Sequence, residues 1–258
     1  MSTPVHTAVI LAAGRGTRLG ETGTEIPKGF IQLGAHAIVE ESIVRLRRAG
    51  IERIIIVTGH QQQWYEALVD RLGSFVQTVH NPQFATCGSL YSLACARADL
   101  QEDFLLLESD LLYEQRALTT LMHGGPDAVL LSGPTGAGDE VWVETRDGRL
   151  VNMSKERRAL GGEPVGEFVG ITRLSRNLFE LLMELALERL ADDPMLEYEV
   201  DGLVALAGAA PLPCTRVDDL LWTEIDDEGQ LLRARTVTYP AIVRRDGPDP
   251  GLDPSAGA

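Results

Sequence analysis

Lysine is almost absent from this sequence. The chain has 23 basic residues, of which only Lys28 and Lys155 are lysine. Lysine offers a compact point charge with three donors, whereas arginine offers a broad planar fork. The scarcity therefore favours two sites that need the smaller ion. The alternative is that a lysine-poor composition leaves its last two lysines at arbitrary positions.

Cysteine and histidine are also scarce, which argues against two kinds of stabilising site. The three cysteines, Cys87, Cys95 and Cys214, form no CxxC pair, and their odd number argues against a disulfide framework. The five histidines show no HxxxH or similar ligand spacing, which argues against a zinc site. We expect the thiols to pack as small hydrophobic side chains.

Long apolar runs and net positive charge are missing too. No apolar run approaches the ~18 residues that a membrane span needs. The first residues pass into a glycine loop without a basic leader, so we expect a strand there, no signal peptide and a cytoplasmic protein. The formal net charge of −15 repels nucleic acid and anionic lipid. A phosphate-bearing substrate therefore needs a local positive cluster, for which the candidates are Arg15, Arg18, Lys28 and Lys155.

Runs of consecutive apolar residues indicate strands that are buried on both faces, and hence a mostly parallel sheet. The runs are Thr7–Ala12, Ile51–Thr58, Phe104–Leu107 and Ala128–Leu131. Segments of helical spacing lie between them and stop at Gly50 and Gly73. This alternation predicts an α/β protein with a Rossmann-like, doubly wound sheet. We expect one domain over residues 1–245 and a disordered Pro/Gly/Asp-rich tail over residues 246–258.

The pattern changes after Gly138. Polar and apolar residues alternate on both sides of Asp147–Gly148, which predicts a β-hairpin inserted into the fold. A strand at Glu167–Thr172 and a helix over Ser175–Leu190, with Ser175 as its N-cap, follow. The remaining expected elements are a helix over Leu196–Leu206, strands around Cys214–Val217 and Trp222–Ile225, and a helix from Asp227.

The loop after the first strand has the features of a phosphate-binding loop. Gly14 and Gly16 lack side chains, so backbone N–H groups there can approach a triphosphate closely. A Rossmann dinucleotide site needs a third glycine, where this chain has Leu19, and an acid at the end of the second strand, where it has Thr58–Gly59. A Walker A loop is excluded because no G-K-[ST] follows. The loop therefore disfavours an NAD-dependent oxidoreductase.

Acidic residues follow two predicted strands at positions suited to a metal ion. Asp110 lies just past the carboxyl end of a buried strand, where ligands of open α/β sheets bind. Mg²⁺ prefers oxygen ligands and is held by one or two carboxylates plus substrate phosphates. We expect Asp226 as the second carboxylate, with Glu224 as a further contact because residues two apart on a strand share a face. Alternatively, Asp110 and Asp226 cap the helices that follow them.

Two further segments carry groups that could select a substrate. Asn81 and the loop over Thr86–Leu90 lead into a helix, where N–H groups and hydroxyls either read a base or cap that helix. In the hairpin, Glu140, Trp142 and Glu144 would share one face. An acid beside an aromatic ring suits an ammonium or trimethylammonium group, and the alternative is a solvated strand edge.

The segment LAAGRGTRL followed by Pro-Lys resembles the signature of the sugar-nucleotide type of nucleotidyltransferase, which joins a nucleoside triphosphate to a phosphate-bearing acceptor and releases pyrophosphate. More of the chain resembles a narrower branch, the cytidylyltransferases that act on phosphocholine or 2-aminoethylphosphonate. The matching segments are Asn81–Leu93, Leu106–Glu114, Ala137–Glu144, Val151–Glu156, Gly166–Ile171 and Leu220–Glu228. The presence of both GDEV and NMSK favours the phosphonate side.

The resemblance implies an enzyme that uses Mg²⁺ to join CMP from CTP to a small phosphonate, above all 2-aminoethylphosphonate. It implies cytosine recognition by Gly88 and Ser89, and we assign catalytic roles to Lys28, Lys155 and Arg18. The expected nucleotide-binding residues are Leu11, Ala12, Ala13, Gly14, Arg15, Gly16, Asn81, Thr86, Gly88 and Ser89. The expected acceptor-binding residues are Asp139, Glu140, Trp142 and Lys155, and the expected metal ligands are Asp110, Asp226 and Glu224.

Several alternatives stay open at this point. The acceptor could instead be phosphocholine, a hydroxyalkyl phosphonate, phosphonoformate or a sugar 1-phosphate, and Glu140 with Trp142 discriminates among them because an amine needs both. A non-catalytic nucleotide-sensing module is the alternative from another class. The sequence does not distinguish Mg²⁺ from Mn²⁺. Helix faces could form a homodimer, although no sequence feature selects an interface.

Overall fold

A computed structural model describes residues 4–16, 19 and 26–247 of the chain. Arg18, to which the sequence assigns a catalytic role, lies outside the described residues. The strands are β1 (Thr7–Ala12), β2 (Arg53–Thr58), β3 (Val76–His80), β4 (Phe104–Glu108), β5 (Leu111–Tyr113), β6 (Ala128–Ser132), β7 (Trp142–Arg146), β8 (Arg149–Ser154), β9 (Gly166–Leu174), β10 (Cys214–Val217) and β11 (Trp222–Glu224).

Helices connect these strands. The α-helices are α2 (Ile38–Arg48), α3 (Gln62–Leu72), α4 (Ser89–Cys95), α5 (Arg116–Met122), α6 (Arg176–Asp192), α7 (Val204–Ala209), α8 (Glu228–Arg233) and α9 (Tyr239–Asp246). Short 3₁₀ segments are η2 (Lys28–Phe30), η3 (Arg97–Asp99) and η4 (Arg157–Ala159), and π-helical turns are η5 (Tyr198–Leu203) and η6 (Ala234–Thr238).

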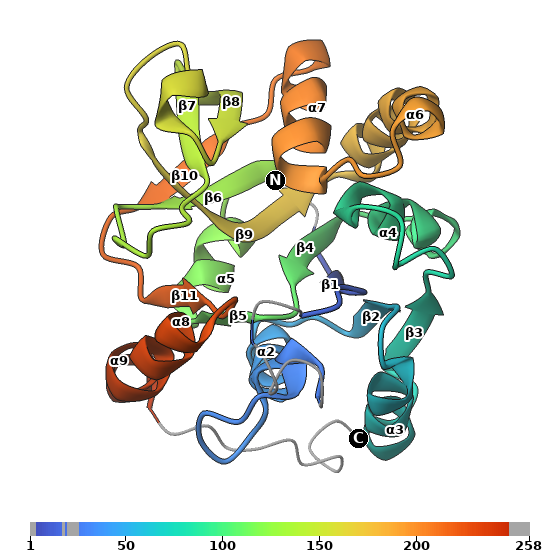
Figure 1. Cartoon of the computed structure of the whole chain (residues 1–258), viewed down its shortest axis with the longest axis vertical. Coiled ribbons are helices and arrows are strands. Elements are labelled where there is room, and N and C mark those ends of the chain that lie inside the picture. Colours follow the sequence, from blue (N-terminus) through green and yellow to red (C-terminus); the bar gives the residue numbers. More distant parts are fainter. Residues whose placement is uncertain (1–3, 17–18, 20–25, 248–258) are drawn as a thin grey trace.

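Nine of the described strands form one large mixed sheet in the order β10-β6-β9-β4-β1-β2-β3, which β7 joins at β9 and β8 extends through β7 (Figure 1). Strands β5 and β11 form a separate two-stranded sheet. Strand β1 runs parallel to β2 and β4, β2 runs parallel to β3, and β6 runs parallel to β10. Strand β9 runs antiparallel to its neighbours β4 and β6. The sheet is therefore mostly parallel, as the continuous apolar runs predict.

Helices cover both faces of the sheet, which confirms the doubly wound architecture. In β1, Ala8 and Ile10 pack with apolar side chains of α2, α3 and α5. Val9 and Leu11 point to the other face and pack with side chains of α4, α6 and α7. Successive side chains of a strand point to opposite faces of the sheet. Because both faces are covered by helices, nearly every residue of β1 is apolar.

The hairpin of β7 and β8 places Lys155 next to the main sheet. Its turn residues Asp147 and Gly148 have φ values of 52° and 72°, and a two-residue turn of this kind requires positive φ at both positions. Trp142 pairs with Glu167 of β9, so the hairpin continues the sheet from that strand. Because Lys155 follows the last residue of β8 directly, the hairpin returns it toward the sheet.

The C-terminal strand β11 brings distant acids to the centre of the fold. It pairs with β5 in antiparallel register, with Glu224 opposite Leu111. The Ile225 N–H donates to the Asp110 carbonyl oxygen at 3.2 Å. Acids that are more than a hundred residues apart in sequence therefore lie side by side.

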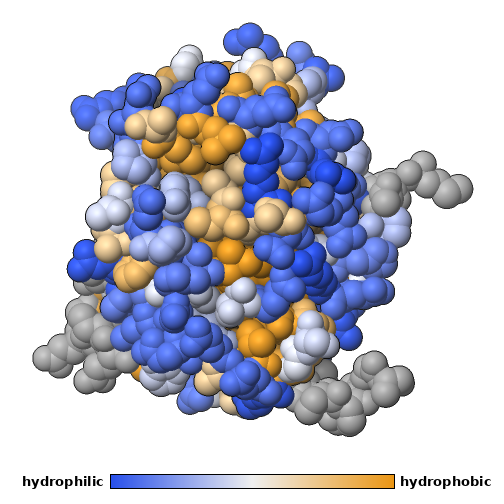
Figure 2. All heavy atoms as spheres, turned by 90° about the vertical axis from the view of Figure 1, so that its right-hand side faces the viewer, coloured by the Kyte–Doolittle hydropathy of each residue, from blue (hydrophilic) through white to orange (hydrophobic). Residues whose placement is uncertain are grey.

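One boundary of the predicted tail is wrong. Residue 246 was expected to open the disordered segment, but Asp246 is the last residue of α9 and accepts a hydrogen bond from the Gln115 N–H at 2.7 Å. Residues 248–258 lie outside the described part of the chain. Among the helices that the structure describes, none combines the length and hydropathy of a membrane span. The face that carries α3, α4 and α6 is mostly hydrophilic, with hydrophobic residues gathered along its middle (Figure 2).

Candidate active site

A cleft of about 270 Å³ opens at the carboxyl ends of β1 and β4. Both lysines of the chain line it, and so do most of the predicted nucleotide-binding and metal-binding residues. The predicted residues that line the cleft are Leu11, Ala12, Ala13, Gly14, Gly16, Lys28, Gly88, Ser89, Asp110, Lys155, Glu224 and Asp226. Ligands of open α/β sheets bind at this edge, where the loops after parallel strands meet.

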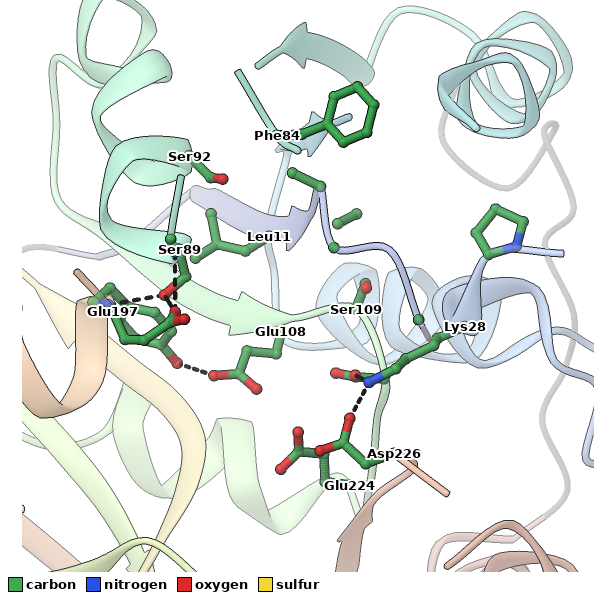
Figure 3. A pocket seen from close by; sticks show the side chains of 18 of the residues that line it. Leu11, Lys28, Phe84, Ser89, Ser92, Glu108, Ser109, Glu197, Glu224 and Asp226 are labelled. Atoms are coloured by element: carbon green, nitrogen blue, oxygen red, sulfur yellow. Dashed lines mark hydrogen bonds and ion pairs between the residues drawn. The ribbon is translucent and has the colours of Figure 1, made fainter. Parts of the chain in front are cut away.

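Lys28 lines one end of the cleft and places a cation there. Its Nζ donates to Asp110 Oδ2 at 2.8 Å and to the Asp226 carboxylate (Figure 3). Burial would lower the pKa of Lys28, but the two ion pairs outweigh this effect and hold the pKa above its ordinary value. The ammonium therefore stays charged in a buried, acid-lined place.

Three carboxylates lie close enough together to share a cation. Glu108, Asp110 and Glu224 each offer an oxygen within 4.8 Å of the others. Burial, with the charges of Glu108 and Asp110, raises the pKa of Glu224 to about 10. Burial raises the pKa of Glu108 as well, followed in effect by the charge of Glu199. Buried oxygens that repel one another in this way fit a hard divalent cation such as Mg²⁺.

The structure resolves the alternative roles of the predicted metal ligands. Asp110 does not cap a helix, because strand β5 follows it. The N-cap of α8 is Asp227, whose side chain accepts from the Gln230 N–H, while Asp226 pairs with Lys28. Sequence reasoning missed Glu108, the last residue of β4. The signal that could have found it is its place in the sequence, since it precedes Asp110 by two residues and ends the same strand.

The glycine loop after β1 forms one wall of the cleft. Gly14 and Gly16 both line it, and Gly16 has a φ of 64°, a conformation that favours glycine. Arg15 lies between them with an exposed side chain. The backbone of this loop therefore borders the cleft, and Lys28 and Lys155 are the described basic residues that line the cleft itself.

The loop before α4 is held by its own side chains. Asn81 is fully buried, and its amide donates to Ser92 Oγ at 2.9 Å and to Cys87 Sγ at 3.2 Å. The Thr86 side chain is exposed and donates to the Gln83 carbonyl oxygen at 3.3 Å. These two predicted nucleotide-binding residues therefore shape the loop in the structure. The loop residues that line the cleft are Phe84, which sequence reasoning missed, and Cys87, Gly88 and Ser89.

That loop end is covered by a segment that sequence reasoning missed. The Gly88 N–H donates to the Pro194 carbonyl oxygen at 2.8 Å, and a Cβ on Gly88 would lie 2.2 Å from the Leu196 carbonyl oxygen. Both the N–H and the hydroxyl of Ser89 donate to Glu197 (Figure 3). Ser89 thus does not cap α4, whose N-cap is Gly88. Glu197 therefore accepts from both donors of Ser89.

A smaller cavity of about 50 Å³ adjoins the cleft, and we call it the side cavity. It shares Glu108, Lys155, Glu199 and Glu224 with the cleft, and its other polar lining includes Asp139 and Glu140. The side cavity is therefore lined mainly by acids on its charged surface, and Lys155 lies where it joins the cleft.

Not every predicted acceptor residue faces the side cavity. Trp142 packs against Arg157, whose guanidinium carbon lies 4.4 Å from the ring centre. Glu144 accepts a hydrogen bond from the Gly161 N–H at 2.7 Å. Strand β7 begins only at Trp142, so Glu140 belongs to the preceding loop and does not share a strand face with the other two. The prediction that Glu140, Trp142 and Glu144 share one strand face is therefore wrong.

Glu199 makes the stability of the metal-free protein depend on pH. Burial raises its pKa to about 7 from the ordinary value of 4.5. Because the folded-state pKa is the higher one, its contribution to stability is full below pH 4.5 and is lost as the pH rises toward 7. Between pH 5.5 and 7.5 we expect the wild type to lose about 2 kcal/mol more unfolding free energy than Glu199→Gln does.

Denaturant unfolding in a chelating buffer measures this difference between the two proteins. The exposed Glu188→Gln is the control, and equal losses in wild type and Glu199→Gln would contradict the expectation.

The sequence matches the model of the MobA-like NTP transferase domain over residues 8–193, so the chain belongs to this family. The nucleotidyltransferase class that the resemblance of LAAGRGTRL and Pro-Lys implies is therefore confirmed. CMP-5′-(3-aminopropyl)phosphonate synthase from Streptomyces rubellomurinus is 30% identical over 247 residues, which cover 90% of this chain and 38% of that protein. 2-Aminoethylphosphonate cytidylyltransferase from Lancefieldella rimae is 26% identical over 211 residues, which cover 76% of this chain and 81% of that protein.

A solved structure shows the same fold. The inositol-1-phosphate CTP transferase from T. maritima superimposes with a TM-score of 0.79 at 19% identity, covering 95% of this chain and 97% of that one. The aminopropylphosphonate synthase and three bifunctional IPC transferase and DIPP synthase proteins are longer, and this chain spans between 38% and 53% of their lengths.

Proposed function

We propose that the protein is a metal-dependent cytidylyltransferase, which joins CMP from CTP to a small phosphonate and releases pyrophosphate. The preferred acceptor in this proposal is 2-aminoethylphosphonate. One observation carries it: Lys28 and Lys155, the only lysines of the chain, line one cleft together with a cluster of carboxylates. Lys155 also lines the acidic side cavity, so it stands between the places assigned to the two substrates.

The reaction needs positioning and charge compensation, and no covalent nucleophile. A phosphonate oxygen attacks the α-phosphorus and forms the new P–O bond, while the bond from that phosphorus to the β-phosphate's bridging oxygen breaks. Pyrophosphate leaves with that oxygen and its electron pair. Lys28 offsets charge on the α-phosphate and the leaving group, and Lys155 holds the phosphonate oxygens. Two anions can then approach within the ~3–3.5 Å that reaction requires.

A bound Mg²⁺ would neutralise triphosphate oxygens in the same cleft. Asp110, Asp226 and Glu224 would hold it, and Glu108 is a further carboxylate within reach of the same place. The observation that favours a divalent cation is the close approach of Glu108, Asp110 and Glu224, whose carboxylate oxygens lie within 4.8 Å of one another. A cation would stabilise the charged form of these crowded acids, in line with the raised pKa of Glu224.

The choice of CTP rests on the relatives and on the end of the cleft next to α4. The printed names of the relatives include a CMP-phosphonate synthase and a 2-aminoethylphosphonate cytidylyltransferase. In this chain Ser89 lies at the end of the cleft opposite Lys28 (Figure 3), and Gly88, the residue before it, lines the cleft as well. We propose that the cytosine binds there, against the start of α4 and the Glu197 carboxylate.

Phosphocholine is the second candidate acceptor, because a choline-phosphate cytidylyltransferase from Streptococcus pneumoniae is 31% identical over 107 residues. The acids Asp139 and Glu140 in the side cavity suit either an ammonium or a trimethylammonium group. They are unsuitable neighbours for phosphonoformate, which carries a second anion. A nucleotide-sensing module without turnover would have no need for both lysines beside the carboxylate cluster.

Pyrophosphate release tests the proposal. CTP, UTP, ATP and GTP are crossed with 2-aminoethylphosphonate, 2-hydroxyethylphosphonate, phosphonoformate, phosphocholine and glucose 1-phosphate in the presence of Mg²⁺. Release confined to CTP with 2-aminoethylphosphonate is the expected result. Release with CTP and a non-amine phosphonate would keep the reaction class and discard the roles of Asp139 and Glu140. No release from any pair would favour the nucleotide-sensing module.

A further inference from the structure

Two residues that line the side cavity each carry a buried polar atom that has no hydrogen-bond partner among the described residues. They are Glu167 Oε2, from β9, and Trp222 Nε1, from β11. Both residues line the cavity, and sequence reasoning assigned a function to neither. One atom is an acceptor and the other a donor, and leaving either unpaired in a protein interior is unfavourable.

Glu167 is held so that one carboxylate oxygen is satisfied and the other is not. Its side chain has no exposed surface, and its Oε1 accepts a hydrogen bond from the Thr135 N–H at 2.6 Å. Arg233 lies near, but its guanidinium donates to the Thr135 carbonyl oxygen at 2.9 Å. The backbone bond fixes the carboxylate in one orientation, and the unsatisfied Oε2 requires a donor that the described residues do not supply.

Charge in the side cavity is arranged asymmetrically. Asp139 and Glu140 line it together with Glu167, and Asp139 Oδ2 accepts from Gln230 Nε2 at 2.7 Å. Lys155 lines both this cavity and the main cleft. Glu108, Glu199 and Glu224 line both spaces as well, so Lys155 is the described cation of a boundary that also carries acids. Beyond this boundary the side cavity adds Asp139, Glu140 and Glu167 and no described cation, which favours a molecule that is anionic at the end next to Lys155 and cationic at the other end.

We propose that Glu167 is the specificity-determining residue for the acceptor and holds its primary ammonium group through Oε2, while the Trp222 Nε1–H donates to an oxygen of the same molecule. This inference rests on the proposed function and narrows it to ω-aminoalkylphosphonates. A primary ammonium supplies N–H donors to Glu167, whereas a trimethylammonium supplies none. A hydroxyl supplies a donor without the charge that Asp139 and Glu140 call for, and the carboxylate of phosphonoformate would repel Glu167.

Glu167→Gln tests the assignment with little change of shape. The amide oxygen can still accept from the Thr135 N–H, but the amide nitrogen then faces the ammonium as a second donor. We expect the KM for 2-aminoethylphosphonate to rise by roughly 10–100-fold, as expected for a lost charge-assisted hydrogen bond, with the KM for CTP unchanged. The KM for 2-hydroxyethylphosphonate, where it is measurable, should change far less.

The matched control is Glu163→Gln. Glu163 precedes the same strand and loses the same charge, but its side chain is 95% exposed and it lies outside the cavity lining. It should leave every KM unchanged. A folded Glu167→Gln protein with the wild-type KM for 2-aminoethylphosphonate would overturn the assignment.

A series of acceptors tests the same idea in the wild-type protein, without any variant that could fail to fold. In 2-aminoethylphosphonate the nitrogen is methylated once, twice and three times. We expect kcat/KM to fall with each lost N–H and to be lowest for the trimethylated compound. Equal or better use of the trimethylated compound would overturn the inference and leave cytidylyl transfer intact. No turnover of any phosphonate with CTP would instead overturn the proposed function, and the inference with it.

Discussion

Replacing Lys28 with alanine should lower kcat with CTP and 2-aminoethylphosphonate by roughly 10²–10³-fold, the effect of removing one preorganised donor to the transition state. Lys28 is the ammonium between Asp110 and Asp226, and it lines the cleft at the end where the glycine loop passes. Without it, the α-phosphate and the departing pyrophosphate lose their nearest cation and meet two unpaired carboxylates. Steady-state kinetics at saturating substrates measures the effect.

Two controls separate the chemical effect from damage to the fold. Lys28→Arg keeps the charge but should recover little activity, because a planar fork cannot replace a compact ammonium between two carboxylates. Arg146→Ala removes an exposed cation from the hairpin and should leave kcat unchanged. Thermal unfolding reports whether Lys28→Ala remains folded, since removal of one partner from a buried ion pair is destabilising. A folded Lys28→Ala protein with wild-type kcat would contradict the proposed role.

Replacing Lys155 with alanine should act on the acceptor and not on the nucleotide. We expect the KM for 2-aminoethylphosphonate to rise by roughly 10–100-fold, because the phosphonate loses a charge-assisted partner, and the KM for CTP to change little. Lys155 follows β8 and lines both the cleft and the side cavity. Initial rates measured over a grid of both substrates separate the two constants.

Stability distinguishes the two lysines as well. Lys155 is exposed, whereas the side chain of Lys28 is only 16% exposed and is ion-paired. Lys155→Ala should therefore unfold at the wild-type temperature, and Lys28→Ala should not. Normal saturation by the acceptor in a folded Lys155→Ala protein would exclude contact between Lys155 and the phosphonate.

Local patterns predicted the elements whose structure depends on nearby residues. The run Thr7–Ala12 forms β1 without a change of boundary, and all six of its residues are buried. Asp147–Gly148 forms the predicted turn, and Ser175 caps α6 by accepting from the Leu178 N–H. Each of these signals lies within a few residues of the structure that it specifies.

The missed parts of the candidate site depend on contacts between distant segments. Glu197 reaches Ser89 from more than a hundred residues away, and no local pattern marks it as a residue of the cleft. In the sequence Glu167 is one polar residue among the apolar residues of a strand. Only the structure shows that its side chain is buried and that it accepts a hydrogen bond from the Thr135 N–H. Trp142 was predicted beside the acceptor from alternation alone, and the structure packs it against Arg157.

The bond that forms is the central claim, and the product reveals it most directly. 2-Aminoethylphosphonate labelled with ¹⁸O on its phosphonate oxygens is incubated with CTP and Mg²⁺, and the products are examined by ³¹P NMR and mass spectrometry. We expect a CMP-phosphonate anhydride with two coupled phosphorus resonances and an ¹⁸O bridge, together with pyrophosphate that carries no label. Intact CTP and unchanged phosphonate after prolonged incubation with the folded protein would contradict the account.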